Sequence, residues 1–405
     1  MKLRIHPSRL SGLAVAPPSK SVAHRYLIAA ALANGESRIE GISSSEDISA
    51  TVDCLRALGA EITLGGEAAT VLGFDPRTAA PRGPLGCRES GSTLRFLLPL
   101  AWLSGSPVTL TAGGRLPERP LTVYEEIAAR EGLLLEREGA VIRASGRLRG
   151  GEYTVSGNIS SQFITGLLFA LPFTGRDSVI HLLPPVESRS YLDLSLEALS
   201  RFGLAARFTD ELTLTVPATD RLTPCSCQVE GDYSNAAFLD ALTLLGHEVT
   251  VGGLSDGSRQ GDRVYREHFA ALKDGTPTIS LADCPDLGPI LMAMAADLHG
   301  ARFVNTGRLR LKESDRGVAM AAELAKLGAR VSLADEEITV LPSELHPPKE
   351  EIDGHNDHRI VMATATLMTR YGGVIRGCEA VKKSYPDYFT TLESLGCEVT
   401  YYENE

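Results

Sequence analysis

An internal repeat constrains the fold of this chain more than any single motif, because a repeated pattern requires a repeated structure. Six stretches share one layout: a small or charged polar cluster, ten to fifteen apolar and small residues at helical spacing, then usually a glycine and a β-rich run. They are residues 16–35, 89–110, 159–180, 231–251, 284–304 and 356–375. Taking Lys20, Ser92, Ser161, Ser234, Asp286 and Asp357 as markers, the intervals are 72, 69, 73, 52 and 71 residues, so the repeat is close to seventy residues with one shorter step.

A second helical pattern alternates with the first. Each copy reads as an amphipathic helix that ends at a glycine and turns directly into an alternating strand. The copies are residues 55–64, 199–208, 324–333 and 392–401. The glycines expected to form left-handed C-caps are Gly59, Gly203, Gly328 and Gly396, with Gly132 in a weaker fifth copy. The repeat then contains strand, helix, strand, helix and strands, which indicates an α/β fold whose first helices are buried all round and whose second helices are amphipathic.

Polar clusters stand where each apolar helix is expected to begin. Serine is a common N-cap, so one interpretation of each cluster is an ordinary helix start. The alternative is an anion site, because unpaired N–H groups and the helix dipole favour negative charge, and Lys20 and Arg25 would add to it. If the repeats are related by rotation, their helix starts would converge on one region rich in N–H donors and cations.

Composition limits the possible partners. A chain of 405 residues is longer than one hydrophobic core usually grows, so we expect two domains. A net charge of −11 argues against nucleic acid or an anionic membrane as the main partner, and any anion binding must be local. The basic start is not followed by an apolar run of signal-peptide length, and we expect a cytoplasmic protein. Seven scattered cysteines predict reduced thiols and no metal site.

Seven motifs resemble, in order, those of the 5-enolpyruvylshikimate-3-phosphate synthase family, and the match covers nearly the whole chain. They are SKSVAHR (19–25), ESGSTLRF (89–96), GGRLPERP (113–120), SSQF (160–163), RLKESDR (310–316), NDHRIVMA (356–363) and KKSYPDYF (382–389). The resemblance implies two similar domains, each of three βαβαββ repeats in an inside-out α/β barrel, with the active site in the interdomain cleft. It places the first domain at residues 1–14 and 229–405 and the second at residues 15–228. We attribute the shorter step to the crossing between these domains.

The resemblance also implies a reaction, the addition–elimination that transfers the enolpyruvyl group of phosphoenolpyruvate to the 5-hydroxyl of shikimate-3-phosphate. No cofactor or metal is implied, glyphosate is an implied inhibitor, and we expect a monomer that binds small molecules and neither nucleic acid nor membrane. The implied catalytic residues are Lys20, which contacts phosphoenolpyruvate and takes part in proton transfer, Glu313 as acid and base at C3, and Asp286 as base for the hydroxyl.

The same resemblance implies the binding residues. Those for phosphoenolpyruvate are Lys20, Gly91, Arg119, Gln162, Arg316, Arg359 and Lys383. Those for shikimate-3-phosphate are Ser21, Arg25, Ser160, Ser161, Gln162, Ser188, Tyr191, Asp286 and Lys312. The segment from Asn305 to Arg308 matches the family poorly, and none of its residues is assigned a contact.

Several of these residues have a simpler interpretation. KESDR at residues 312–316 has the composition of a solvated salt-bridge face. His358 could be a satisfied core histidine, so its role is at most binding or positioning. Asp47 and Glu187 stand beside family-like stretches, but ordinary caps or surface charges would look the same, and both are left out of the predicted site.

Three other functions compete with this prediction. A related enolpyruvyl transferase acts on UDP-N-acetylglucosamine, but it has a reactive cysteine in a loop that corresponds to GGRLPERP, which has none. The RNA-3′-phosphate cyclase group has similar repeats, but this chain is acidic and lacks an obvious basic, aromatic-rich stripe. A sensor of phosphorylated metabolites would need the same cations, and only the pair of Asp286 and Glu313 favours turnover over binding alone.

Overall fold

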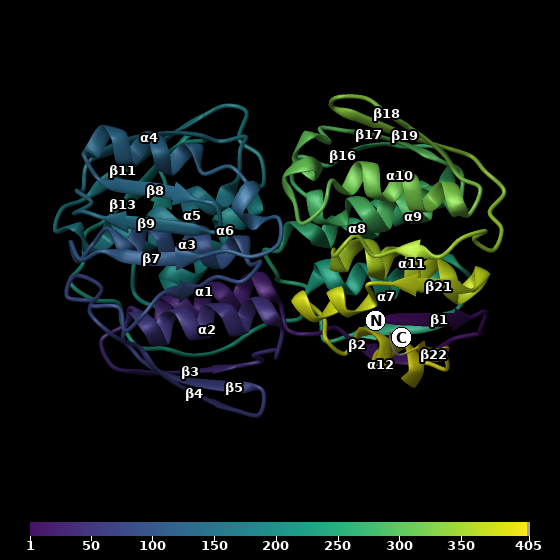
Figure 1. The fold of residues 1–405 in the computed structure, drawn as a ribbon, viewed down its shortest axis with the longest axis horizontal. Helices are drawn as coiled ribbons and strands as arrows, with labels where there is room; N and C mark the ends of the chain where they lie inside the picture. Colours follow the sequence, from purple (N-terminus) through teal and green to yellow (C-terminus); the bar gives the residue numbers. More distant parts are fainter. Residues whose placement is uncertain (403–405) are drawn as a thin grey trace. The chain divides into compact units, whose positions relative to one another are not determined.

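Two compact units make up the chain in the computed structural model, which describes residues 1–402 (Figure 1). The continuous unit spans residues 18–230, and the split unit combines residues 1–17 with the chain from Gly231 onward. Each unit contains a hydrophobic core of its own. The sequence analysis placed the crossings after residues 14 and 228, and the identity of each unit as a separate domain of the family stays a prediction.

The continuous unit contains three repeats of the order βαβαββ. The first has β14 (Ser226–Gln228), α1 (Lys20–Ala31), β3 (Glu36–Glu40), α2 (Glu46–Leu58), β4 (Glu61–Gly65) and β5 (Ala68–Leu72). The second has β6 (Leu85–Gly86), α3 (Gly91–Ala101), β7 (Val108–Thr111), α4 (Thr122–Glu131), β8 (Leu134–Glu138) and β9 (Val141–Ser145). The third has β10 (Glu152–Ser156), α5 (Ser161–Ala170), β11 (Ser178–Leu183), α6 (Arg189–Arg201), β12 (Arg207–Phe208) and β13 (Thr213–Val216).

The split unit contains two complete repeats and one shorter one. One complete repeat has β16 (Thr278–Ser280), α9 (Gly288–Asp297), β17 (Ala301–Val304), α10 (Arg316–Lys326), β18 (Arg330–Leu333) and β19 (Glu337–Leu341). The other has β20 (Ile352–Asp353), α11 (His358–Tyr371), β21 (Gly373–Arg376), α12 (Tyr388–Ser394), β22 (Glu398–Tyr402) and β1 (Lys2–His6). The shorter repeat has β2 (Ser11–Val15), α7 (Tyr233–Leu244), β15 (Glu248–Gly252) and α8 (Tyr265–Asp274).

Five four-stranded sheets within residues 1–402 share one strand order. The first strand of each repeat pairs in parallel with the second, the second is antiparallel to the fourth, and the third pairs antiparallel with the fourth at the edge. Parallel neighbours need a crossover, and the first helix of the repeat provides it. Two sheets are completed by distant segments: β14 pairs with β3, and β1 lies between β21 and β22 (Figure 1).

The shorter step in the sequence comes from a repeat without a hairpin. Its strands β2 and β15 form a two-stranded parallel sheet, and in the described residues α8 is followed directly by β16 of the next repeat. The markers Ser234 and Asp286 are therefore only 52 residues apart. Our attribution of this step to the domain crossing is wrong, because the crossing at Glu230 lies between Ser161 and Ser234, an interval of 73 residues.

The first helices are buried on nearly all sides, as predicted. In α9 every residue from Gly288 to Ala296 is buried, and in α11 the buried run extends from His358 to Thr369. The second helices bury one face only: α6 buries five of its thirteen residues. Burying a Leu, Ile or Met side chain stabilises a fold by about 1.5–3 kcal/mol, so each first helix stabilises its unit along its whole length.

Within residues 1–402, no helix is long and apolar enough to cross a membrane.

The glycines expected to end the second helices all have positive φ, which confirms the predicted left-handed backbone. The values are 125° at Gly59, 68° at Gly132, 85° at Gly203, 97° at Gly328 and 99° at Gly396. Residues with a Cβ adopt this region at a steric cost, whereas glycine does not. The chain can therefore leave each of these helices and enter the next strand at once.

We predict that Gly132→Ala lowers the free energy of unfolding by about 1–2 kcal/mol, the cost of a left-handed backbone for alanine. Nothing lies within 4 Å of a Cβ added at this glycine, so the cost is conformational rather than steric. Urea unfolding of the full chain measures it. Gly65→Ala is the matched control, because its added Cβ also meets nothing within 4 Å and its φ is not positive. Equal stability of the two variants would contradict the prediction.

Candidate functional site

A buried arginine at the start of α10 connects the polar groups of the split unit. Asp315 caps this helix through its side chain, which places Arg316 at the first helical position. The Arg316 guanidinium is only 1% exposed and lies 2.8 Å from each of three carboxylates, those of Asp286, Glu313 and Asp357. Burial disfavours the charged guanidinium, but these carboxylates outweigh it and raise the pKa of Arg316 above its ordinary value. Arg316 therefore joins three separate segments as a permanent cation.

Asp286 lies among three cations. It belongs to the short 3-10 helix η4 (Pro285–Leu287) directly before α9. Its carboxylate is 3.0 Å from Lys312, 2.8 Å from Arg316 and 3.3 Å from Arg359. Burial opposes the charged form, but Arg359, Lys312 and Arg316 together hold the pKa of Asp286 well below its usual range. Asp286 is therefore an anion at neutral pH and, with these cations in place, a weak proton acceptor.

Two neighbouring groups titrate closer to neutrality. Burial lowers the pKa of Lys312 to about 8, although Asp286 opposes the shift. Burial and the charge of Asp286 raise the pKa of Asp262, which accepts a hydrogen bond from Ser234, to about 6. The charge of the cluster consequently changes on both sides of pH 7. The sequence analysis did not assign Asp262, whose surroundings depend on contacts between distant segments.

The start of α11 provides the remaining predicted cations of this unit. Asp357 is the N-cap and accepts a hydrogen bond of 2.9 Å from the backbone N–H of Arg359. Lys383, at the end of the 3-10 helix η6 (Cys378–Lys383), donates to the backbone carbonyl of Asn356 at 2.5 Å. Since Arg316 pairs with Asp357, all three arginine and lysine side chains expected to bind phosphoenolpyruvate on this unit gather at one helix start.

These contacts decide how KESDR is interpreted. The side chains of Lys312, Glu313 and Arg316 are 18%, 15% and 1% exposed. A solvated salt-bridge face requires exposed charges, so that interpretation is wrong. The segment instead contributes to a buried cluster in which cations and carboxylates neutralise one another.

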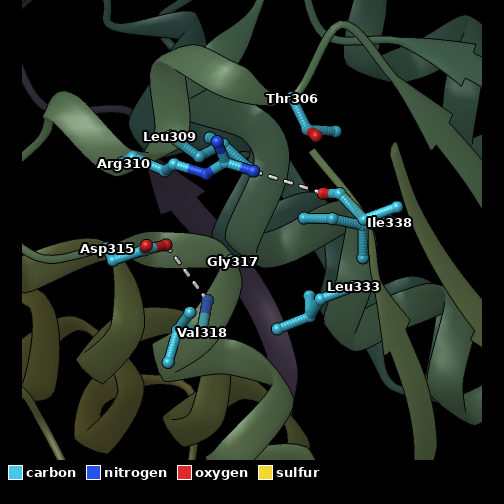
Figure 2. A pocket seen from close by; sticks show the side chains of 9 residues that line it. Thr306, Leu309, Arg310, Asp315, Gly317, Val318, Leu333 and Ile338 are labelled. Carbon is cyan, nitrogen blue, oxygen red and sulfur yellow. Dashed lines mark hydrogen bonds between the residues drawn. The ribbon is translucent and has the colours of Figure 1, made fainter. Parts of the chain in front are cut away.

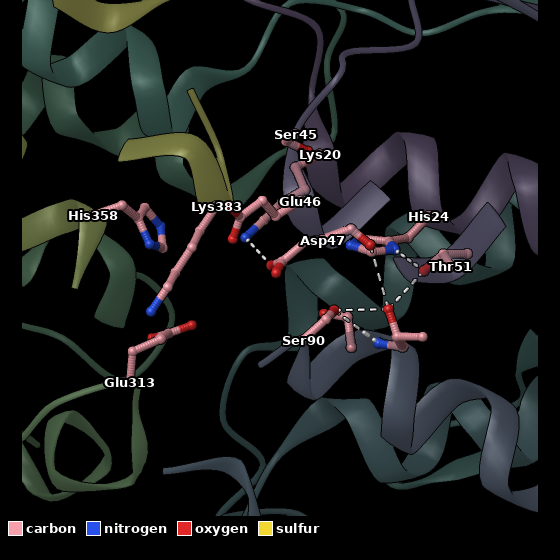
Figure 3. A network of polar contacts seen from close by, with 12 residues as sticks. Lys20, His24, Ser45, Glu46, Asp47, Thr51, Ser90, Glu313, His358 and Lys383 are labelled. Atoms are coloured by element: carbon pink, nitrogen blue, oxygen red, sulfur yellow. Dashed lines mark hydrogen bonds and ion pairs between the residues drawn. The ribbon is translucent and has the colours of Figure 1, made fainter. Parts of the chain in front are cut away.

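On the continuous unit, Lys20 begins α1 and pairs with Asp47. The ammonium Nζ lies 2.7 Å from Oδ2 of Asp47, and the two side chains are 14% and 11% exposed (Figure 3). Asp47 lies in the first turn of α2, where the helix dipole favours a carboxylate. The sequence analysis left Asp47 out as an ordinary cap or surface charge. The position of Asp47 at the start of the second helix of its repeat was the sequence signal that could have identified it as a site residue.

A chain of buried polar side chains joins α1, α2 and the start of α3 (Figure 3). His24 Nδ1 lies 2.8 Å from the Thr51 hydroxyl, which lies 2.7 Å from the Thr93 hydroxyl. Thr93 donates to the Ser90 hydroxyl at 2.7 Å. Burial, with the charge of Lys20 and a neighbouring arginine, holds the pKa of His24 well below its usual range, so the imidazole is neutral. The network links α1, α2 and the start of α3 without adding charge.

Arg25 is buried and connects α1 with α6. It donates to the Ser195 hydroxyl at 2.9 Å, to the carbonyl of Ser21 at 2.7 Å and to the carbonyl of Tyr191 at 3.0 Å. Burial lowers its pKa to about 10, which leaves it charged at neutral pH. Ser188 directly precedes α6 with a left-handed φ of 56°. Four of the residues expected to bind shikimate-3-phosphate therefore lie around the starts of these two helices.

Gln162, in the first turn of α5, links two helix starts. Its side-chain oxygen accepts from Arg95 at 2.8 Å, and its side-chain nitrogen donates to Ser92 at 3.0 Å. Ser160 caps α5 by accepting from the Gln162 backbone N–H at 3.3 Å, and Ser161 is the first helical residue. The sequence analysis recorded Arg95 only as part of a helix start. Its contact with a residue 67 positions later has no local signal.

The predicted residues form two groups, one on each unit. The split unit has Asp286, Lys312, Glu313, Arg316, Arg359 and Lys383. The continuous unit has Lys20, Ser21, Arg25, Gly91, Arg119, Ser160, Ser161, Gln162, Ser188 and Tyr191. Over residues 1–402, no set of three or more His, Cys, Asp or Glu side chains is arranged to hold a metal ion.

A small hollow in the split unit contains none of these residues (Figure 2). It is lined by Thr306, Leu309, Arg310, Asp315, Gly317, Val318, Leu333, Ala334 and Ile338. Its charged side chains already have protein partners: Arg310 donates to the carbonyl of Ala334 at 3.3 Å, and Asp315 accepts from the backbone N–H of Val318 at 3.2 Å. The hollow therefore offers an apolar surface rather than an anion site.

Comparisons of the sequence and of the structure with known proteins point to the same family. The family model described as EPSP synthase (3-phosphoshikimate 1-carboxyvinyltransferase) matches residues 5–392. A Clostridium kluyveri protein named 3-phosphoshikimate 1-carboxyvinyltransferase is 37% identical, covering 98% of this chain and 97% of the relative, and one from Clostridium perfringens is 38% identical over 98% of each. A solved EPSP synthase from Acinetobacter baumannii aligns with a TM-score of 0.78 at 21% identity, covering 99% of this chain and all of the other. The predicted fold class is confirmed.

Gly91 generates a specific prediction, because it lies against two arginines. A Cβ added at this first residue of α3 would lie 2.6 Å from Nη1 of Arg119 and 3.0 Å from Nη1 of Arg95. Gly91→Ala must therefore displace the Arg119 guanidinium, and we predict a roughly 10- to 100-fold rise in the KM for phosphoenolpyruvate, the scale of a misplaced binding group. Steady-state kinetics measures it.

Gly86→Ala is the matched control for this substitution, because its added Cβ meets nothing within 4 Å. We expect its kinetics to equal those of the wild type, and we expect both variants to bind shikimate-3-phosphate normally by calorimetry. A normal KM for phosphoenolpyruvate in Gly91→Ala would show that the position of Arg119 does not matter for this ligand.

Proposed function

Since the chain belongs to the EPSP synthase family, its activity is enolpyruvyl transfer, and we propose that the charged groups of both units serve this one reaction. The 5-hydroxyl oxygen of shikimate-3-phosphate attacks C2 of phosphoenolpyruvate as C3 gains a proton. The tetrahedral adduct then loses inorganic phosphate from C2 as a proton leaves C3. The product keeps the enolpyruvyl group as an ether, a step of the shikimate pathway to aromatic amino acids.

The arrangement around Arg316 supports this proposal most directly. Phosphoenolpyruvate has a phosphate and a carboxylate, and arginine binds either group through two parallel N–H donors. Arg316 and Arg359 lie at adjoining helix starts, and Lys383 lies beside the second of them. We propose that these three cations bind phosphoenolpyruvate together with Arg119 and Gly91 of the continuous unit. Carboxylates now occupy part of their donors, and the substrate would replace some of those contacts.

The same geometry gives Asp286 a role that depends on substrate. Within the protein, Arg359, Lys312 and Arg316 keep the pKa of Asp286 low. An anionic substrate that draws on these cations weakens their attraction for the carboxylate, so the pKa of Asp286 rises toward its ordinary value. Asp286 then becomes a better base for the 5-hydroxyl proton when phosphoenolpyruvate is bound. Asp286 would therefore accept the hydroxyl proton readily only when phosphoenolpyruvate is bound.

Glu313 and Lys20 complete the proposed catalytic set. Arg316 orients the Glu313 carboxyl through the contact of 2.8 Å, and we assign Glu313 the proton that is added to and removed from C3. Lys20 is assigned to phosphoenolpyruvate and to proton transfer, and Asp47 positions its ammonium group at 2.7 Å. The addition step needs an acid that gives a proton to C3, and the elimination step needs a base that removes a proton from C3. The carboxyl group of Glu313 can do both.

The second substrate is assigned mainly to the continuous unit. We propose that Ser21, Arg25, Ser160, Ser161, Ser188 and Tyr191, with Lys312 and Asp286 of the split unit, bind shikimate-3-phosphate. Gln162, which already bonds Arg95 and Ser92, is assigned to both ligands. We further propose that the protein works as a cytoplasmic monomer on these small molecules.

The proposal predicts that inorganic phosphate is released only when shikimate-3-phosphate and phosphoenolpyruvate are both present. A coupled phosphate assay with each substrate alone and then with both measures this requirement. We expect no effect of a chelator, because the proposed site meets the charge of the substrates with arginine and lysine. Comparable turnover of UDP-N-acetylglucosamine would instead favour the related enolpyruvyl transferase.

A second prediction concerns Glu313→Gln, which removes a proton carrier with little change of volume. We expect kcat to fall by roughly 10²–10⁴-fold, the usual contribution of general acid–base catalysis. Binding of shikimate-3-phosphate by calorimetry should change little. Glu350→Gln, at an exposed carboxylate of the same unit, is the control and should keep normal kinetics. A near-normal kcat for Glu313→Gln would remove this residue from the chemistry.

A further inference from the structure

The turn that precedes α11 has an unusual backbone. His355 and Asn356 have φ values of 49° and 50°, and two consecutive left-handed residues with side chains persist only where their surroundings hold them. The turn leads directly into Asp357, which accepts from the Arg359 N–H and pairs with Arg316. The carbonyl of Asn356 accepts from Lys383 at 2.5 Å. The conformation of this turn therefore bears on all the cations at this helix start.

One side chain of α10 holds the turn in place. Glu323, only 2% exposed, accepts from the Asp353 backbone N–H at 2.9 Å through one oxygen and lies 2.8 Å from Nε2 of His355 through the other. Asp353 in turn accepts from the His355 backbone N–H at 2.8 Å. His355 is thus bonded through its backbone to β20 and through its imidazole to α10. These bonds fix the residue that has the first of the two left-handed φ values.

The charges around His355 favour its protonated form. Glu323 and Asp353 face it with negative charge, whereas Lys326, 2.7 Å from Glu323, opposes them. Arg376 pairs with Asp353 at 2.7 Å from β21. The hydrogen bond to Glu323 is the main cause of a raised pKa for His355. The charged bond between His355 and Glu323 therefore stabilises the folded protein fully below the ordinary histidine pKa of about 6.5. This contribution is lost as pH rises through the raised pKa of His355.

We propose that His355 is a positioning residue for the phosphoenolpyruvate-binding cations: its bond to Glu323 holds the turn at residues 355–356, and the turn fixes Arg359 and Lys383. The inference rests on the proposed function, because it takes the ligand of these cations from there. His355 bonds to Glu323 and Asp353, neither of which is assigned a catalytic role. Its effect should appear in the KM for phosphoenolpyruvate and not in kcat.

The first experiment compares His355→Gln with the wild type from pH 6 to pH 9. Glutamine keeps a side-chain N–H donor for Glu323 but cannot become charged. Because the substrate and the other residues titrate in both proteins, the ratio of the two KM values isolates the effect of the charge on His355. We expect the variant's KM for phosphoenolpyruvate to be roughly 2- to 10-fold higher at pH 6, a typical scale for transmitted coupling, and to approach the wild-type value by pH 9. kcat should stay within twofold.

His299→Gln, at an exposed histidine of the same unit, is the matched control and should follow the wild type throughout. His355→Leu, which has no donor at all, should raise the KM at every pH. A ratio of one at all pH values for His355→Gln would overturn the proposal. A raised ratio that does not change with pH would also overturn it, because it would reflect structure without the charged bond.

Hydrogen exchange provides a second measurement that does not depend on the reaction. We expect the amides of residues 353–359 to exchange several-fold faster in His355→Leu than in the wild type at pH 6, with no change in His299→Gln. If the wild type releases no phosphate from the two substrates but exchange follows this pattern, the proposed function fails and the role of His355 in holding the turn stands. If phosphate is released but neither exchange nor KM changes, the positioning role fails.

Discussion

The buried guanidinium of Arg316 is the contact on which the arrangement of the split unit's polar groups depends. It meets carboxylates from the segment before α9, from the segment before α10 and from the cap of α11, each at 2.8 Å. Removing one partner of such a buried group typically costs roughly 3–5 kcal/mol, a large share of the stability of an ordinary domain. A side chain assigned to substrate binding is therefore also a structural element, and it cannot adjust freely when the ligand arrives.

An acidic protein can hold several largely buried cations in one cluster because the balance of charge is local. Asp286, Glu313 and Asp357 lie among the cations of the cluster, so the protein avoids the large cost of unpaired buried charges. In the proposed binding mode, the phosphate and carboxylate groups of the substrates replace protein carboxylates at these cations. Such an exchange gives less affinity than a site of uncompensated cations would, but it keeps each guanidinium oriented before the ligand arrives.

The sequence predicted those features that depend on local pattern. The buried first helices, the left-handed glycines and the polar helix starts follow from spacing and residue type within one helix and its flanks, and the repeat follows from the recurrence of these local patterns. Contacts between segments could not be predicted in this way. Asp47 pairs with Lys20 from 27 positions away, and Gln162 bonds Arg95 across 67. The 52-residue interval was attributed to the domain crossing instead of to a missing hairpin, because the length of an interval does not show which helices and strands it contains.

The place of β1 has a consequence for synthesis on the ribosome. Among the described strands, β1 is made before the others, whereas its two partners, β21 and β22, are made last. The three repeats of the continuous unit, in contrast, are all present once residue 230 has emerged. Because domains generally fold as units during translation, we expect the continuous unit to form while β1 still has unpaired edges. The sheet of β20, β21, β1 and β22 can therefore be completed only after β1 has waited for nearly the whole described chain to be made.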